Sequence, residues 1–343
     1  MDKQAGKTTF TSVVIDYIIP AIISAGVAIV LFGKVVLISF PNSDTFDTFF
    51  SLTAGLDNYF GFRTAWRPRL FSTALASFTV RVSKWLMAKT TVPIVRSPLE
   101  LTVGLWTAGW FVLICFFLIL FFKRRSLFYT LGLYAGISYG YLARLRWAAR
   151  VYPWDMPALF FFTLFVLLFI NKKYRWVFVM IPLSIGFKET GFILCLAFLF
   201  ADLPWRQRLY MLAGSLALSL GVKIAIDLFV HAPLFLTMET RLNGDAAHGL
   251  YLMGNLQSFE GIFPYFINAG TLLAFLILPN LNRNILYLKL LAIPFIVGTL
   301  LFGNAEEYRI WFEVIPFALY ALDVAIYGDP VKNKTVPAQT GEI

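Results

Sequence analysis

The chain has 343 residues, of which 59% are hydrophobic, 17% are aromatic and 14% are charged. Soluble domains have roughly 25% charged and about 45–50% apolar residues. This composition therefore excludes a soluble globular protein, a disordered chain and a fibrous repeat, and it predicts a polytopic membrane protein. The net charge of +10 is typical of basic residues in cytoplasmic loops, and no segment carries a nucleic-acid-binding motif.

Apolar segments of transmembrane length begin close to the N-terminus. A membrane-spanning helix needs about 20 apolar residues, and segment 13–33 is the first that qualifies. No small-residue cleavage site follows it, so we expect an uncleaved span and not a removed signal peptide. Further spans are predicted at 101–122, 126–143, 156–170, 207–230, 261–281, 285–303 and 310–327.

Segment 176–201 is apolar but is interrupted by Lys188, Glu189 and Thr190. One continuous helix would hold a lysine and a glutamate in the middle of the bilayer, which is unfavourable. Two short helices that meet at a polar tip avoid this. Basic residues flank the segment on both sides, at 172–175 and 206–208, so both ends are predicted to be cytoplasmic and the tip to lie outside.

The sequence therefore predicts an all-α integral membrane protein of about ten transmembrane helices with both termini inside. Residues 1–327 form one transmembrane domain, and residues 328–343 form a polar, disordered cytoplasmic tail. The outer-face loops are predicted at 41–100, 144–155, 231–260 and 304–309.

Segment 70–89, in the first outer loop, is predicted to be an amphipathic interfacial helix on the membrane surface. The apolar residues of this segment recur at three- and four-residue spacing: Phe71, Leu75, Phe78, Val82 and Trp85. An eleventh span is the alternative.

The first outer loop also holds candidate catalytic and phosphate-binding residues. Asp44, Asp47 and Asp57 are followed by Arg67 and Arg69. A carboxylate can take a proton from an acceptor hydroxyl as a general base. An arginine binds phosphate through a planar, bidentate fork. Solvated loop charges near lipid headgroups are the alternative explanation.

The second outer loop combines arginines with aromatic residues. Arg144 and Arg150 face outward on the predicted topology and could neutralise a phosphate headgroup. Asp155 stands at the beginning of the next span, beside Tyr152 and Trp154. The aromatic residues alone are typical of an interfacial belt.

Ionisable residues within membrane segments are functional candidates by default. Lys188 and Glu189 are such candidates, although a mutual ion pair could merely stabilise the turn. Lys223 and Asp227 lie four residues apart in a span and are expected to pair with each other.

A final acidic cluster precedes the last span. Glu306, Arg309 and Glu313 could orient a polar headgroup, or Glu313 could form an ion pair with Arg309 that locks the last helix. The two histidines, His231 and His248, lack the spacing of a metal site. The sequence requires no metal, although paired acids could bind Mg²⁺ or Mn²⁺.

Several motifs occur in the order found in one enzyme superfamily. Acids in the first outer loop are followed by WRPRLF, DMPALFFF, SIGFKETGFIL and EYRIWFEVIPF. This order resembles the GT-C superfamily of polytopic glycosyltransferases, which includes protein O-mannosyltransferases and the bacterial aminoarabinose transferase. The resemblance extends over about residues 13–325.

The resemblance implies transfer of a sugar from a polyprenyl-phosphate donor to a lipid, glycan or protein acceptor. The reaction would be inverting and would occur on the periplasmic or extracellular face of a bacterial inner membrane. Asp44 is the leading candidate for the base, with Asp47 and Asp57 in reserve. The implied phosphate-binding residues are Arg67, Arg69, Arg144, Arg150, Lys188 and Arg309, and the implied substrate-binding residues are Tyr152, Asp155, Glu189, Glu306 and Glu313. A lipid-linked-saccharide flippase or transporter, a polysaccharide polymerase and a structural subunit are the alternatives.

Overall fold

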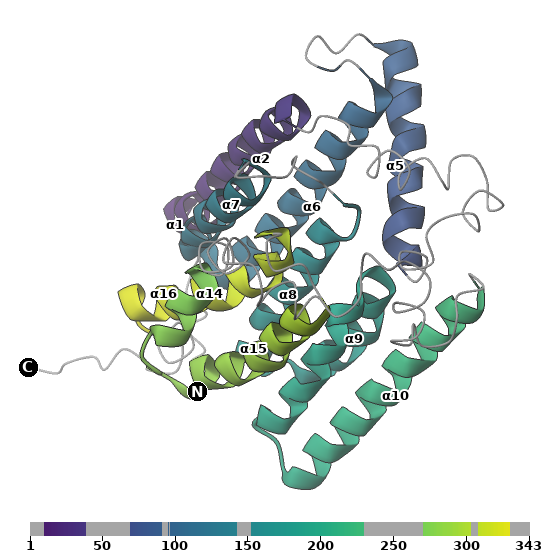
Figure 1. Ribbon diagram of the computed structural model, residues 1–343. Helices are drawn as coiled ribbons and strands as arrows, with labels where there is room; N and C mark the ends of the chain where they lie inside the picture. The colour runs from purple at the N-terminus through teal and green to yellow at the C-terminus, as the bar shows by residue number, and fades with distance from the viewer. Residues whose placement is uncertain are drawn as a thin grey trace, which may run out of the picture.

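The computed structural model describes residues 10–38, 69–90, 95, 97–142, 152–229, 270–302 and 308–329. Every regular element in these ranges is a helix, as Figure 1 shows. The elements are α1 (Phe10–Val13), η1 (Val14–Ile18), α2 (Ile19–Ile38), α5 (Leu70–Lys89), α6 (Pro98–Phe122), η2 (Lys123–Arg125), α7 (Ser126–Leu142), α8 (Asp155–Ile170), α9 (Tyr174–Phe187), η3 (Glu189–Phe200), α10 (Trp205–Phe229), α14 (Gly270–Ile277), α15 (Arg283–Phe302), η4 (Tyr308–Val314) and α16 (Ile315–Tyr327). Element η1 is a π-helix, and η2, η3 and η4 are 3₁₀-helices.

The prediction of an all-helical protein is confirmed for the described residues, and some of its helices are suited to crossing a membrane. Within the described residues, three helical stretches are long and apolar enough to cross a membrane: Phe10–Val36, Pro98–Tyr139 and Trp205–Phe229. The second of them contains the basic turn η2. The apolar helices α8, α9 and η3 are shorter. The ten-span topology stays a prediction.

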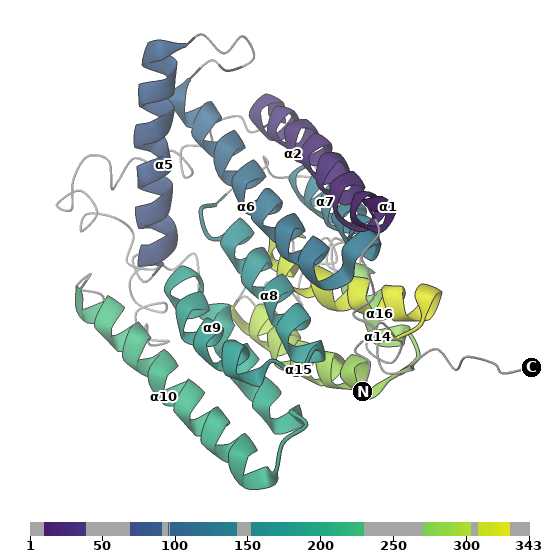
Figure 2. The ribbon, with the colours of Figure 1, turned by 180° about the vertical axis from the view of Figure 1, so that it is seen from behind.

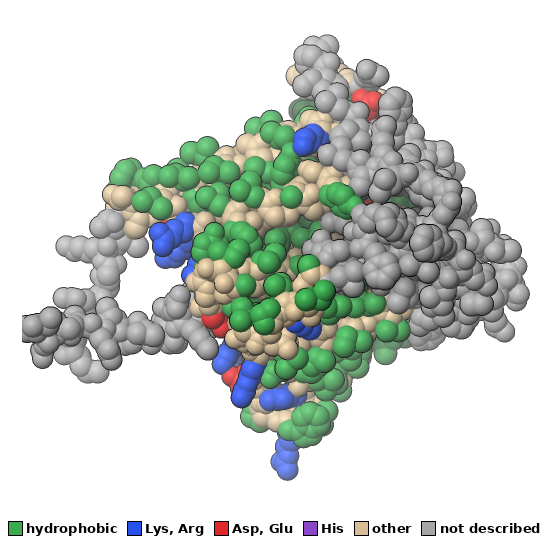
Figure 3. Space-filling view, turned by 60° about the vertical axis from the view of Figure 1, so that its left-hand side comes forward, with side chains coloured by type: hydrophobic (Ala, Val, Ile, Leu, Met, Phe, Trp, Pro, Cys, Tyr) green, Lys and Arg blue, Asp and Glu red, His purple; other side chains and the backbone are tan. Residues whose placement is uncertain are grey.

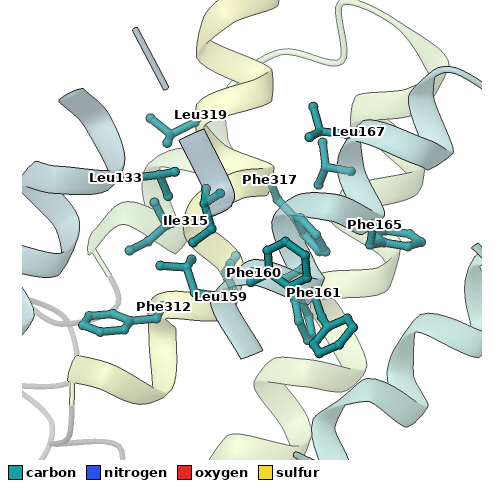
Figure 4. Close-up of a cluster of buried hydrophobic side chains, with 14 of the residues drawn as sticks. Leu133, Leu159, Phe160, Phe161, Phe165, Leu167, Phe312, Ile315, Phe317 and Leu319 are labelled. Carbon is teal, nitrogen blue, oxygen red and sulfur yellow. The ribbon is translucent and has the colours of Figure 1, made fainter. Parts of the chain in front are cut away.

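Helix α8 lies at the centre of the bundle. All of its residues except Leu164 are buried, as expected for a helix that is apolar on every side. Figures 1 and 2 show α6, α8, α9 and α10 side by side in this order, and α16 and η4 also pack on α8. In Figure 4, Phe160, Phe161 and Phe165 of α8 lie beside Ile315 and Phe317 of α16 in the buried apolar cluster.

The outside of the bundle is also apolar. On the first helical stretch, Ile22, Ile29 and Val30 are exposed, and Tyr210 and Leu218 are exposed on α10. Figure 3 shows hydrophobic side chains over most of the described surface on one side of the molecule. Monomeric soluble proteins rarely expose large contiguous apolar patches, so this surface is suited to contact with lipid.

Helix α5 occupies the segment that was predicted to be amphipathic. It stands upright beside α6 in Figure 1 and packs against α6 and α9. Its buried face is made of small residues, including Ser72, Ala76 and Ser83, whereas Phe78 and Trp85 of the apolar stripe are exposed. Phe78 and Trp85 therefore face away from the bundle, whereas Phe71, at the beginning of the stripe, packs on Phe187 of α9.

The interrupted segment forms an antiparallel pair of short helices, as predicted. Nζ of Lys172, before α9, lies 2.5 Å from Oδ2 of Asp202, after η3. The hydroxyl of Tyr174 accepts a hydrogen bond of 2.9 Å from the backbone N–H of Asp202. The hydrogen bond and the charge of Lys172 lower the pKa of the Asp202 carboxyl below its ordinary value. The basic flanks of this helical hairpin thus lie together, opposite its tip.

Other turns that were predicted to be cytoplasmic also meet. The Arg125 guanidinium donates to the carbonyl oxygens of Gly328 at 3.1 Å and Tyr327 at 3.0 Å. Nδ2 of Asn282 donates to Oδ2 of Asp329 at 2.9 Å. The turn at η2, the turn before α15 and the end of α16 are therefore neighbours, which agrees with their predicted placement on one side of the membrane.

Candidate functional site

The helical hairpin of α9 and η3 is broken at a single lysine. Helix α9 ends at Phe187, and Lys188 adopts an extended conformation with φ −159° and ψ 136° before η3 begins at Glu189. The Lys188 N–H donates to the carbonyl of Ser184 at 2.9 Å and closes the last turn of α9. The break holds the side chains of Lys188 and Glu189 at the tip, where the sequence predicted them.

Lys188 forms a buried ion pair with an acid 125 residues further along the chain. Its Nζ donates to Oε1 of Glu313, and the two side chains are only 11% and 1% exposed. A buried charge needs such a partner because it has lost its hydration. The pairing joins the hairpin tip to η4, the 3₁₀-helix that leads into the last helix.

One alternative raised by the sequence is wrong in consequence. Lys188 was considered a partner for the adjacent Glu189, but the structure pairs it with Glu313. The pairing of Glu313 with Arg309, four residues before it, stays a prediction, because the Arg309 side chain lies outside the described residues.

Glu189 pairs with Arg69, the residue immediately before α5. Nε of Arg69 donates to Oε2 of Glu189 at 3.0 Å. The Arg69 guanidinium carbon also lies 4.3 Å from the centroid of a Trp154 ring, in cation–π geometry. The arginine fork is thereby fixed on two sides, by a carboxylate and by an aromatic face.

The turn that contains Tyr152 and Trp154 supports the Arg69 side chain. The rings of Tyr152 and Trp154 stack with their centroids 4.9 Å apart. Both residues are buried, at 3% exposure each, so the structure does not place them in an exposed interfacial belt. Nε1 of Trp106 on α6 donates to the carbonyl of Pro153 at 3.0 Å and anchors the turn between the two rings.

Asp155 is the buried first residue of α8. Its Oδ2 accepts a hydrogen bond of 3.3 Å from the backbone N–H of Tyr152. An acid at this position also interacts favourably with the N-terminal end of the helix dipole. Asp155 therefore fixes the Tyr152–Trp154 turn over the beginning of α8, close to the residues that hold Arg69.

The first turn of α5 is docked on the end of α9, which places Arg69 at the tip. Oγ of Ser72 donates to the carbonyl of Phe187 at 3.2 Å, and the rings of Phe71 and Phe187 meet edge to face at 5.9 Å. Gly186 permits this approach, because a Cβ atom there would overlap the Phe71 ring.

Lys223 and Asp227 pair with each other on α10, as predicted. Nζ of Lys223 lies 2.5 Å and 2.6 Å from the two carboxylate oxygens of Asp227. Neither residue hydrogen-bonds to the tip in the described contacts, although the charges of both interact with Glu189.

Several predicted site residues cannot be placed. The candidate bases, three of the predicted phosphate-binding arginines and one predicted substrate-binding acid lie outside the described residues: Asp44, Asp47, Asp57, Arg67, Arg144, Arg150 and Glu306. The backbone of Arg309 belongs to η4, but its side chain also lies outside the described residues. Among the side chains that the structure describes, no group of three histidine, cysteine or acidic residues could hold a metal ion.

One buried acid was not singled out from the sequence. Asp323 on α16 is fully buried, accepts a hydrogen bond of 3.1 Å from the Tyr129 hydroxyl and lies 3.8 Å from Nη1 of Arg125. It belongs to the opposite end of the bundle from the Lys188 tip. The sequence could have indicated this residue, because a lone acid in an apolar span is a functional candidate.

Arg69, Lys188, Glu189 and Glu313 thus come together at one end of the helices, in two ion pairs. Both pairs are formally neutral; Lys188–Glu313 is buried, and Arg69–Glu189 is partly exposed. Such a site can bind an anionic group only if one of the cations is shared with it or released to it. Comparison of the chain with protein-family models, with curated proteins and with solved structures found no match.

Proposed function

We propose that the chain is a membrane glycosyltransferase of the GT-C type. It would move a sugar from a polyprenyl-phosphate donor to a lipid, glycan or protein acceptor on the non-cytoplasmic face. The observation that carries the proposal is the convergence of four separate motifs. Arg69 of WRPRLF contacts Trp154, in the turn that Asp155 of DMPALFFF holds, and it pairs with Glu189. Glu189 follows Lys188 of SIGFKETGFIL, which pairs with Glu313 of EYRIWFEVIPF.

The depth of the tip supports a reaction on a lipid-linked substrate. With 14 residues, α9 is about 21 Å long at ~1.5 Å per residue. With 12 residues, the 3₁₀-helix η3 is about 24 Å long at ~2.0 Å per residue. Both are shorter than a hydrocarbon core of about 30 Å. We therefore expect the tip to lie within the outer part of the membrane, where a lipid phosphate can reach it.

The chemistry needs a base and a stabilised leaving group. The acceptor hydroxyl attacks the anomeric carbon, the bond between that carbon and the phosphate oxygen breaks, and the electron pair leaves with the phosphate. A carboxylate of the first outer loop, with Asp44 as the first candidate, takes the hydroxyl proton. Lys188 and Arg69 supply positive charge to the phosphate as its negative charge grows, and the low polarity of the site strengthens this interaction.

The experiment is a transfer assay with the purified protein and a panel of polyprenyl-phosphate sugars. We expect release of polyprenyl phosphate and transfer of the sugar with at least one donor. Movement of an intact lipid-linked sugar across reconstituted vesicles, without cleavage of any donor, would instead support the flippase alternative.

A further inference from the structure

The site contains a carboxylate that is satisfied on one side only. Glu313 is 1% exposed at its side chain, and Lys188 holds its Oε1. Its Oε2 is buried and has no hydrogen-bond partner in the described structure. Buried carboxylate oxygens in native proteins are normally hydrogen-bonded, so this oxygen can accept a further hydrogen bond.

The two cations of the site differ in how firmly they are held. Arg69 is fixed by Glu189 and by the Trp154 ring. Lys188 has one described side-chain partner, Glu313, and its ammonium is a point charge on a flexible stem that can turn toward a new anion. Of the two cations, Lys188 is the one that can change partners.

The backbone around this pair is suited to a change of partner. Lys188 is the extended residue between α9 and η3, and Glu313 lies in η4. Element η3, which begins directly after Lys188, and element η4, which contains Glu313, are both 3₁₀-helices. Such helices have poorer hydrogen-bond geometry than α-helices and often mark hinges. Lys188 and Glu313 can therefore separate without the unwinding of an α-helix.

We infer that Glu313 occupies the place of the donor phosphate on Lys188 in the ligand-free protein, and that a lipid-linked phosphate displaces it when it binds. This inference rests on the proposed function, whose substrate class it uses. Displacement leaves Glu313 as a buried, unpaired carboxylate, which is unfavourable. A hydroxyl of the attached sugar satisfies it, because a hydroxyl donates to a carboxylate. The exchange therefore selects a donor that carries both a phosphate and a sugar.

The exchange also favours the transition state. The phosphate of an intact donor is a diester with one negative charge, and it gains a second as the glycosidic bond breaks. Lys188 attracts the departing phosphate more strongly than it attracts the bound diester, so the same exchange that admits the donor lowers the barrier to its cleavage.

The test is equilibrium binding of polyprenyl phosphate, without sugar, to the protein in lipid nanodiscs. Polyprenyl alcohol of the same length is the control for binding of the hydrocarbon tail. In Glu313→Gln the internal competitor is neutral, so we expect polyprenyl phosphate to bind about tenfold more tightly than to the wild type, whereas the alcohol binds equally to both. Lys188→Met should abolish the preference for phosphate over alcohol.

Two further variants keep the test decisive. Asp323→Asn neutralises another buried acid at the opposite end of the bundle and should leave binding unchanged. If Glu313→Gln does not fold, Glu313→Asp retracts the carboxylate from Lys188 and should also tighten the binding of polyprenyl phosphate, by a smaller factor.

The possible failures are distinguishable. A wild type that prefers phosphate to alcohol, together with a Glu313→Gln variant that binds polyprenyl phosphate no better, would overturn the exchange and leave the proposed function standing. A wild type with no preference for phosphate, and no transfer activity, would overturn both.

Discussion

Arg69 and Glu189 are 120 residues apart in the chain, yet Nε of the arginine donates to the carboxylate at 3.0 Å. The contact joins the beginning of α5 to the hairpin tip between α9 and η3. It also places the arginine over the Trp154 ring. Arg69, from the segment predicted to be the first outer loop, is thereby held by the residue that follows Lys188.

Arg69→Lys should destabilise the protein although it keeps the charge. Lysine lacks the planar fork that contacts Glu189 and Trp154 together, and the loss is expected to be about 1–2 kcal/mol. Thermal unfolding of the detergent-solubilised protein measures it. Arg81→Lys changes an exposed arginine on α5, the helix that follows Arg69, and is the matched control. Equal melting temperatures for the two variants would contradict the role of Arg69.

Gly186→Ala should displace α5 from the tip. The added Cβ would overlap the Phe71 ring, and overpacking of this kind destabilises by about 1–3 kcal/mol. Gly26→Ala on α2 is the control, because nothing lies within 4 Å of its added Cβ.

The cause of the Gly186→Ala defect can be checked in a double-mutant cycle. Combining Gly186→Ala with Phe71→Leu removes part of the clashing ring and should recover some of the lost stability, since the two positions are in contact. Strictly additive effects would show that the close approach of α5 to α9 is not the cause.

Cysteine labelling should show opposite sidedness for the two ends of the bundle. The native cysteines, Cys115 and Cys195, are buried and should give little background. A cysteine at exposed position 89, the last residue of α5, should react with a membrane-impermeant reagent added from outside. A cysteine at exposed position 124, in η2, should react only after the membrane is opened. Outside labelling at position 124 would contradict the topology.

Replacement of the first-loop acids tests the base. Asp44→Asn keeps the shape of the side chain and removes its basicity, so sugar transfer should fall by roughly 10²–10⁴-fold. The same assay on Asp47→Asn and Asp57→Asn identifies the base if Asp44 is not the one. Full activity in all three variants would remove the carboxylate mechanism.

The helices and the polar tip could be predicted from the sequence, because both depend on local properties. Apolar runs marked the helices, and the polar interruption at residues 188–190 required a break between α9 and η3. The partners could not be predicted. Lys188 and Glu313 are 125 residues apart, and the packing of η4 on α7 and α8 brings the acid to the tip. Local spacing instead suggested Glu189, which is adjacent in sequence, as the partner of Lys188. The burial of Tyr152 and Trp154 could likewise not be predicted from the sequence, because an interfacial belt and a buried stack contain the same residue types.

The role of Lys188 is tested by sugar transfer from polyprenyl-phosphate donors in the wild type, in Lys188→Met and in Lys188→Met combined with Glu313→Gln. We expect Lys188→Met to lower both donor affinity and turnover, and the double variant to remain impaired although its buried charges are balanced again. Recovery of wild-type transfer in the double variant would show instead that Lys188 serves only to neutralise Glu313.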